Sequence, residues 1–172
     1  MIAGIILKDN IEEKSVIAFL DEEIECFEVS TNDELVEKLD EKKPGVVAVD
    51  APMEVGPTEL NEGEKELKEQ GHIFTPSGQQ KTTARRLEAL QDQAFNVMGG
   101  NTPDFIRFDP HITAEELALD TDEALKSIGV EASNIRGAEQ FDAVLGAITA
   151  RFYEQNQFEE MGVVVPEALD EE

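Results

Sequence analysis

The chain of 172 residues has few positive charges and a single cysteine, and each shortage limits what the protein can be. It carries 14 lysines and arginines against 39 aspartates and glutamates, which gives a formal net charge of −25. Because affinity for nucleic-acid phosphates comes chiefly from positive surface, this composition disfavours a general nucleic-acid binder. Cys26 has no partner for a disulfide within the chain, and its strand-like surroundings predict a packed core thiol in a reducing compartment.

Several common functional signatures are also absent. The sequence contains no internal repeat, no glycine-rich phosphate loop, no cysteine or histidine pair with metal-ligand spacing and no nucleophile elbow. The first apolar run, residues 2–7, follows Met1 without a basic segment and ends at Lys8, too early for a membrane span or a signal peptide. We therefore expect a cytoplasmic protein without membrane association.

The excess of acidic residues is distributed along the whole chain. Such a charge repels itself and destabilises a compact domain at ordinary ionic strength, so a high-salt cytoplasm and a halophilic source are the simplest hypothesis. An acidic tail or nucleic-acid mimic is the competing interpretation, but the carboxylates are spread rather than blocked. With 40% hydrophobic residues in the chain, residues 1–165 suit one compact domain, and residues 166–172 have the composition of a solvated acidic tail.

The most informative stretch is residues 46–52. Four small or β-branched residues predict a strand that is buried on both faces, and Pro52 cannot continue a ladder of hydrogen bonds. Asp50 should therefore lie at the carboxyl end of this strand, where open α/β sheets carry their chemistry. The residue either caps the following loop or serves as a functional carboxylate.

The segments around this strand predict a small mixed sheet. Three strand-length runs, residues 2–7, 15–20 and 24–29, follow each other through short connections that suit antiparallel neighbours. Thr31 or Ser30 then caps a helix that ends before Gly45. A helical crossover of this length returns the chain parallel to an existing strand, so the strand that reaches Asp50 should lie beside the first one.

The second half of the chain predicts helices and two short strands. The first expected helix is short and exposed, at residues 60–68, and the second begins near Pro76 and buries Ala84, Leu87, Leu90 and Phe95. A brief helix is then opened by a capping box of Thr113 and Glu116, and another runs from Thr121 to Gly129. The last expected helix is long and covers about residues 138–158. The expected strands are residues 105–108 and an edge strand at residues 163–165.

Two groups of side chains in these helices are candidate functional residues. Lys81, Arg85 and Arg86 place three of the 14 positive charges within six residues, and Lys81 shares a helical face with Arg85. These cations either pair with nearby glutamates or hold substrate phosphates. Asp142 lies off the apolar stripe of the last helix, where the small Gly146 one turn on leaves room for a ligand. The alternative is that Asp142, in the first turn, only favours the helix dipole.

Several local motifs carry a resemblance to a known family. They are Val49-Asp50-Ala51-Pro52, the polar segment 64–71 leading to Phe74-Thr75-Pro76-Ser77, the Asp109-Pro110-His111 turn, and Phe141-Asp142-Ala143-Val144 followed by Ala147-Ile148-Thr149-Ala150. Together with the order of the elements, these motifs resemble an uncharacterised family of predicted RNase H-like nucleases, from Met1 to about Gly162. The resemblance implies an α/β fold, an RNase H-like mixed five-stranded sheet with three antiparallel strands and then parallel strands, flanked by helices.

The resemblance also implies a site. In that fold several carboxylates converge on one or two Mg²⁺ ions, because in-line attack on a phosphate requires charge to be neutralised at the attacking and leaving oxygens. Asp50 and Asp142 match two of those positions as catalytic residues and metal ligands, with Mn²⁺ as a substitute ion. Lys81 and Arg85 would then bind the phosphates of a nucleic-acid substrate.

Two positions depart from the family's pattern. Ile6 occupies the place of the aspartate on the first strand, and Arg107 matches the place of a later glutamate. Isoleucine cannot bind magnesium, and an arginine competes for the same carboxylates as an ion pair. A replacement oxygen would have to come from Asp9, Glu54 or Asp109, of which the last two are the better candidates.

Three functional hypotheses follow. The first is a metal-dependent nuclease or phosphoesterase with an incomplete carboxylate site. The second is a catalytically inactive RNase H-fold protein that serves binding or interaction, in which Asp50 bonds to Arg107. The third is a small acidic interaction protein that does not bind nucleic acid, which the charge of −25 favours.

Overall fold

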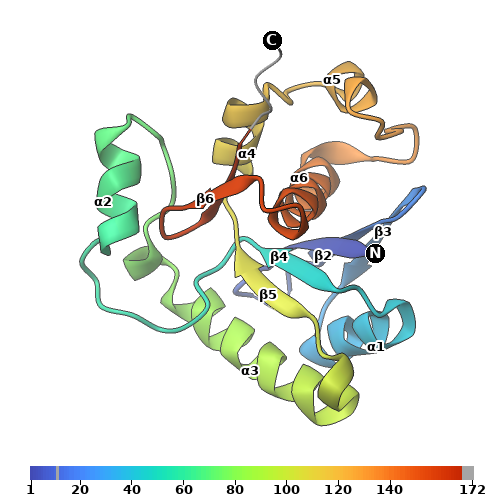
Figure 1. The fold of residues 1–172 in the computed structure, drawn as a ribbon. Coiled ribbons are helices and arrows are strands. Elements are labelled where there is room, and N and C mark those ends of the chain that lie inside the picture. The colour runs from blue at the N-terminus through green and yellow to red at the C-terminus, as the bar shows by residue number, and fades with distance from the viewer. Residues whose placement is uncertain (11, 168–172) are drawn as a thin grey trace.

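A five-stranded mixed sheet forms the centre of the computed structural model, which describes residues 1–10 and 12–167 (Figure 1). The strand order is β3-β2-β1-β4-β5. The bounds are β1 (Ile2–Ile6), β2 (Ser15–Leu20), β3 (Ile24–Val29), β4 (Val46–Val49) and β5 (Asp104–Arg107). The first three strands are antiparallel neighbours, whereas β4 and β5 run parallel to β1. The predicted α/β class, the mixed sheet and the place of β4 beside β1 are confirmed.

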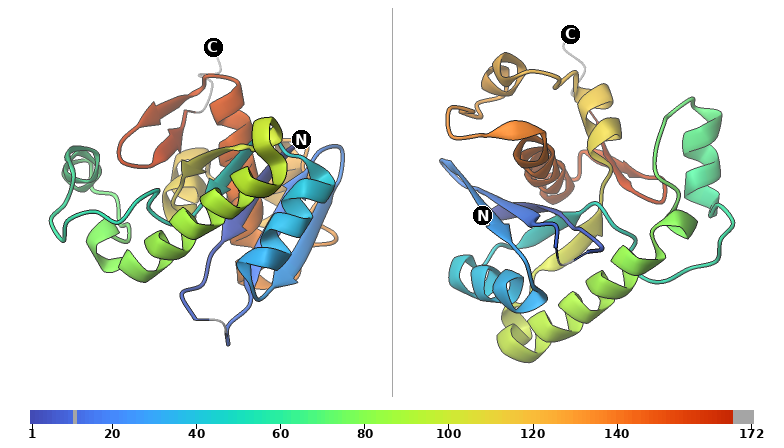
Figure 2. Two further views of the ribbon diagram at one scale, coloured as in Figure 1. Left: turned by 90° about the horizontal axis from the view of Figure 1, so that it is seen from below. Right: turned by 180° about the vertical axis from the view of Figure 1, so that it is seen from behind.

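Helices cover both faces of this sheet. α6 (Gly137–Glu154) lies on one face, and α1 (Asn32–Lys42) and α3 (Lys81–Met98) lie on the other (Figure 2). Successive residues of a strand point to opposite faces, so Ile6 packs on the α6 side and Ile5 on the side of α1 and α3. Every residue of β1, β2 and β4 is buried, which explains why these strands read as continuous apolar runs.

A smaller unit lies beside β5, the edge strand of the main sheet (Figure 1). It contains α2 (Glu62–Glu69), α4 (Pro110–Leu117) and a hairpin of β6 (Phe158–Glu160) with β7 (Val164–Pro166). Its apolar core consists of Leu67, Ile112, Met161, Val163 and Val165. The remaining elements are α5 (Asp122–Ser127) and two short 3₁₀ turns, Ser77–Gln79 and Gly99–Asn101.

The structure corrects several predicted helix details. The inward face of α3 contains Ala84, Leu87 and Leu90 as expected, but Phe95 is 64% exposed and Ala94 takes its place in the core. The N-cap of α4 is Asp109 rather than Thr113, because its carboxylate accepts the N–H groups of the first turn and Pro110 needs no such partner.

The C-terminal region also differs from the prediction. The last helix ends at Glu154, and Phe158 begins β6 instead of extending that helix. The strand predicted at residues 163–165 pairs with β6 in a separate hairpin and does not join the main sheet. Of the predicted acidic tail, Pro166 lies in β7 and Glu167 donates its N–H to Gln157, while residues 168–172 lie outside the described residues. None of the described helices has the length and apolar character that crossing a membrane requires.

Candidate functional site

Asp50 lies where the prediction puts it, at the carboxyl end of β4. Its Oδ1 accepts the Leu7 N–H at 2.7 Å, and its own N–H donates to the Ile5 carbonyl at 3.2 Å. The carboxylate therefore bridges the ends of β4 and β1 and does not cap its own loop through a described hydrogen bond. Burial raises the pKa of Asp50 to about 7, despite the Leu7 hydrogen bond and the nearby Lys8 charge.

Asp109 and Asp142 reach the same edge of the sheet from two other elements. Asp109 follows Phe108, whose N–H donates to Val49 at the end of β4. Asp142 lies on α6 immediately before Ala143, whose carbonyl oxygen lies against Gly4 of β1. Segments that are far apart in the sequence thus bring three carboxylates to neighbouring places.

The charge of Asp109 acts on both of the other acids. Burial and the charges of Asp109 and Glu139 raise the pKa of Asp142, and the charge of Asp109 also acts to raise the pKa of Asp50. Lys8 acts in the opposite direction on both Asp50 and Asp142. These three residues, Asp50, Asp109 and Asp142, are called the acidic corner, and no described ion pair within 4.0 Å includes any of them. Their positive neighbours, Lys8 and Arg107, act on them only at longer range.

The other two predicted replacements for a first-strand acid, Asp9 and Glu54, are not among the charges that shift the pKa of Asp50 or Asp142. Ile6 is buried on the α6 face, while the side chains of Asp9 and Glu54 are exposed. Asp109 is therefore the third acid that the fold brings nearest to Asp50 and Asp142 in electrostatic terms. Within residues 1–10 and 12–167, no three acids, histidines or cysteines are grouped closely enough to enclose a metal ion.

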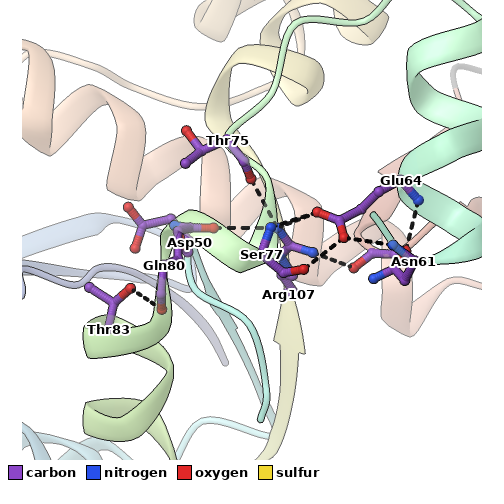
Figure 3. Close-up of polar contacts among 9 residues, drawn as sticks. Asp50, Asn61, Glu64, Thr75, Ser77, Gln80, Thr83 and Arg107 are labelled. Atoms are coloured by element: carbon purple, nitrogen blue, oxygen red, sulfur yellow. Dashed lines mark hydrogen bonds and ion pairs between the residues drawn. The ribbon is translucent and has the colours of Figure 1, made fainter. Parts of the chain in front are cut away.

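Arg107 belongs to a different polar network, which runs from Asp50 to α2 (Figure 3). Its guanidinium donates to the carbonyls of Gly162 and Thr75 at 3.2 and 3.1 Å and to Gln80 Oε1 at 3.3 Å. Gln80 Nε2 donates in turn to the Asp50 carbonyl at 2.8 Å. A single buried side chain therefore joins β5, the loop before α3 and the turn of the β6–β7 hairpin.

Glu64 is the acid that balances Arg107. Its carboxylate is fully buried, lies 3.6 Å from the guanidinium, and accepts hydrogen bonds from the Ser77 N–H and hydroxyl, both at 2.7 Å (Figure 3). Burial opposes its ionisation, but the bonds from Ser77 and Asn61 and the charge of Arg107 together hold the pKa of Glu64 below its ordinary value. The predicted bond between Asp50 and Arg107 is wrong, because Glu64 and main-chain carbonyls use the guanidinium instead.

The three clustered cations of α3 separate into different environments. Arg86 is a structural residue that donates to Asn32, Ser15 and the carbonyls of Lys8 and Ser30. Lys81 donates to the Thr58 hydroxyl at 3.1 Å, and Arg85 is exposed. No ion pair between these cations and a glutamate occurs among the described residues, so the predicted glutamate pairing is wrong for them.

The space predicted beside Asp142 is filled. A Cβ on Gly146 would lie 2.6 Å from the ring of Phe108, and the Thr149 hydroxyl bonds to Thr113 at 2.8 Å. That face of α6 therefore packs against Phe108, which follows β5, and against α4, and it leaves no room there for a ligand. Asp142 is the sixth residue of α6, so it lies in the second turn and gains less from the helix dipole than the prediction assumed.

Sequence reasoning missed the pair of Glu64 and Arg107. The sequence does contain the Asn61-x-x-Glu64 spacing of a capping box, and the structure shows that box at the start of α2. This signal predicts a helix start but not the burial of Glu64, because the partner Ser77 and the cation Arg107 are 13 and 43 residues away.

Comparisons with known proteins support the fold. No family model matches the chain, and no curated protein matches it in sequence. Two solved structures of RuvC from Thermus thermophilus match in fold, each with a TM-score of 0.55 over 96% of this chain and 98% of the RuvC chain. Their sequence identities are 15% for RuvC in complex with a Holliday junction substrate and 14% for the second RuvC structure. The chain thus has the RNase H-like fold that the sequence resemblance implied.

Proposed function

We propose that this protein is an RNase H-like, metal-dependent nuclease or phosphoesterase that acts on nucleic acid through Asp50 and Asp142. The observation that supports the proposal is that Asp109 acts electrostatically on both Asp50 and Asp142, two aspartates that are 92 residues apart in the sequence. Carboxylates that are partly buried and form no close ion pair cost stability, and such an arrangement is more typical of a functional site than of a structural one.

The donor set of the acidic corner fits Mg²⁺ better than a softer metal. It consists of carboxylate oxygens alone, and Mg²⁺ is commonly held by one or two carboxylates together with water and substrate phosphates, without a closed protein cage. Asp50 and Asp142 would hold the ion, with Asp109 beside them, and Mn²⁺ would substitute. When bound, such an ion would supply charge neutralisation at the attacking and leaving oxygens of a phosphodiester.

The chain's own residues then have separate roles. A carboxyl with a pKa of about 7 exchanges its proton readily at neutral pH, which suits Asp50 to accept a proton from water or to release one when a cation arrives. The Leu7 N–H fixes the orientation of that carboxyl at 2.7 Å. Lys81 and Arg85, at the start of α3 next to Gln80, would bind substrate phosphates on the side of the corner where Gln80 contacts the Asp50 main chain.

Cleavage assays with Mg²⁺ or Mn²⁺ in high salt test this proposal. The substrates are a four-way DNA junction, suggested by the Holliday junction bound to RuvC, together with structured RNA, duplex DNA and an RNA–DNA hybrid. We expect Asp50→Asn and Asp142→Asn each to reduce cleavage by roughly two orders of magnitude or more, whereas Asp9→Asn, an exposed control, leaves it unchanged. Undiminished cleavage by Asp50→Asn would refute the assignment.

A catalytically inactive RNase H-fold binding or interaction protein is the second candidate. Ile6 at the place of the first-strand ligand favours it, as does the lack of a closed metal cage among the described residues. Calorimetric titration with Mg²⁺ and Mn²⁺ separates the two candidates, because a binding protein without catalysis takes up no divalent ion at millimolar concentration.

A further inference from the structure

We propose that His72, His111 and Glu115 form a binding site for one transition-metal ion, best suited to Zn²⁺, that ties the end of α2 to α4. The inference goes beyond the proposed function, because the site uses no side chain of the acidic corner and takes a different class of metal. His72 and His111 are the two histidines of the chain, and both lie beside the carboxylate of Glu115.

The turn that ends α2 fixes the position of His72. Gly71 has a φ of 82°, in the left-handed region that favours glycine. The N–H groups of Gly71 and His72 donate to the carbonyls of Lys68 and Leu67, both at 3.0 Å, which closes the helix. Because Leu67 packs with Ile112 of α4 in the small apolar core, this turn holds the imidazole of His72 against α4.

The imidazole of His72 is buried with one ring nitrogen unsatisfied. The side chain is 7% exposed, and its Nδ1 has no hydrogen-bond partner among the described residues. That atom lies 3.5 Å from Glu115 Oε2, without the geometry of a hydrogen bond, and Nε2 lies 3.2 Å from Glu116 Oε1. A buried polar atom without a partner costs free energy, and an ion bound at that atom would remove the cost.

His111 brings a second imidazole to the same carboxylate. His111 and Glu115 are four residues apart on α4, so they share one face of the helix. His111 Nε2 lies 4.0 Å from Glu115 Oε2, the oxygen that also faces His72 Nδ1. Two ligands of a tetrahedral Zn²⁺, each about 2.0 to 2.1 Å from the ion, are about 3.3 Å apart. Both measured distances exceed this spacing by less than about 1 Å.

Exposed side chains must turn to complete the site. As they lie, the three side chains do not enclose an ion. The side chains of His111 and Glu115 are 60% and 55% exposed, so each can change rotamer while His72 stays in place. Two imidazole nitrogens and a carboxylate oxygen are typical ligands of Zn²⁺, with water in the fourth position. Glu116 would then orient the ring of His72 through Nε2.

NMR spectra of the two imidazole rings test the inference directly. The ¹⁵N-labelled full chain, freed of metal with EDTA and then desalted, is titrated with ZnCl₂ at neutral pH in high salt. We expect the signals of both rings to change in one step that is complete at one equivalent of Zn²⁺, and the midpoint of thermal unfolding to rise by several degrees. Mg²⁺ at the same concentration should leave both rings unchanged, because imidazole is a poor ligand for it.

Two variants remove a ligand at an exposed position. His111→Gln and Glu115→Gln should each weaken Zn²⁺ binding roughly tenfold or more, measured by calorimetric titration. Glu123→Gln, at an exposed glutamate of α5, is the matched control and should bind Zn²⁺ like the wild-type protein. Asp50→Asn should keep the same changes of both ring signals, because the acidic corner does not contribute a ligand.

Three results would overturn the site. They are ring signals that do not change at one equivalent of Zn²⁺, a change confined to the exposed His111, and equal Zn²⁺ affinity of Glu115→Gln and wild type. None of these measurements depends on cleavage. If Glu115→Gln loses Zn²⁺ binding while Asp50→Asn still cleaves nucleic acid, the zinc site stands and the proposed function fails.

Discussion

The acidic corner and the network of Glu64 with Arg107 both contain buried carboxylates, but the pKa values of these carboxylates shift in opposite directions. Glu64 is fully buried, yet its pKa lies below the ordinary value, because Ser77, Asn61 and Arg107 satisfy its charge. For Asp50, burial raises the pKa to about 7, because the Leu7 N–H and the charge of Lys8 offset that burial only in part. Burial disfavours the charged form of both groups, and the partners of Glu64 outweigh that effect whereas those of Asp50 do not.

The difference indicates which region supports the fold and which is available for chemistry. The Glu64 network ties α2, the loop before α3 and the hairpin turn to β5, so its charges are used up internally. The three carboxylates of the acidic corner have no ion-pair partner within 4.0 Å among the described residues. A site that takes up a cation or a proton needs carboxylates whose charge is not already neutralised by a close partner.

Removal of Arg107 is expected to have the largest effect. Arg107→Met leaves the fully buried Glu64 without its cation, which should lower the free energy of unfolding by about 3 to 5 kcal/mol, measured by urea denaturation. Arg85→Met, at an exposed arginine, is the control and should change it by less than about 0.5 kcal/mol. The double variant Glu64→Gln/Arg107→Met should recover part of the loss; equal stability of Arg107→Met and wild type would contradict the comparison.

The second prediction concerns the contact that carries Asp142 to the sheet. A Cβ on Gly4 would overlap the Ala143 carbonyl oxygen, so Gly4→Ala should push α6 away from β1. We expect a loss of about 1 to 3 kcal/mol in the free energy of unfolding, together with reduced cleavage, because Asp142 moves relative to Asp50. Gly100→Ala, where a Cβ meets nothing within 4 Å, is the matched control.

Asp50→Asn should act in the opposite direction on stability. With a folded-state pKa of about 7 and an ordinary pKa near 4, the folded wild-type protein holds a proton that the unfolded chain has lost. The contribution of this bound proton to the free energy of unfolding is therefore present at low pH and is lost as the pH rises from about 4 to about 7. Asparagine keeps the acceptor for the Leu7 N–H without a charge, so the variant should exceed wild type at about pH 8 by an amount on the order of 1 kcal/mol.

Urea denaturation at about pH 5 and about pH 8 measures this difference, with the exposed Asp9→Asn as control. A variant that is less stable than wild type at the higher pH would show that Asp50 serves the fold as a cap, and the contrast with Glu64 would disappear.

Of these predictions, the effect of salt on stability should be the smallest. It should still differ between the exposed carboxylates and the buried pair of Glu64 and Arg107. Raising the ionic strength from about 0.1 M to about 1 M shortens the screening length from about 10 Å to about 3 Å, which weakens repulsion among exposed carboxylates but not the buried pair. We expect the midpoint of thermal unfolding to rise by several degrees, as the halophilic hypothesis requires, and the loss caused by Arg107→Met to stay the same. A midpoint that is independent of salt would contradict the hypothesis.

Much of the architecture was predictable because it depends on local patterns. The apolar runs of β1, β2 and β4, the Thr31 cap and the end of β4 at Asp50 each follow from a few neighbouring residues. The predictions failed where distant contacts decided the outcome. Gly146 gave no ligand space because the ring of Phe108, a residue distant in the sequence, fills it. The error at Phe95 was instead local, since Ala94 and not Phe95 continues the helical spacing of Leu87 and Leu90.

By itself, the sequence determined the order of the elements and the place of Asp50 at the end of a buried strand, since strand periodicity and proline act over a few residues. Only the tertiary structure decided which charges meet. Arg107 bonds to Glu64 and not to Asp50, and Asp109 comes near both Asp50 and Asp142, because parallel strands and α6 bring distant residues to one edge. Electrostatic partners depend on distance in space, and no local pattern in the chain encodes that distance.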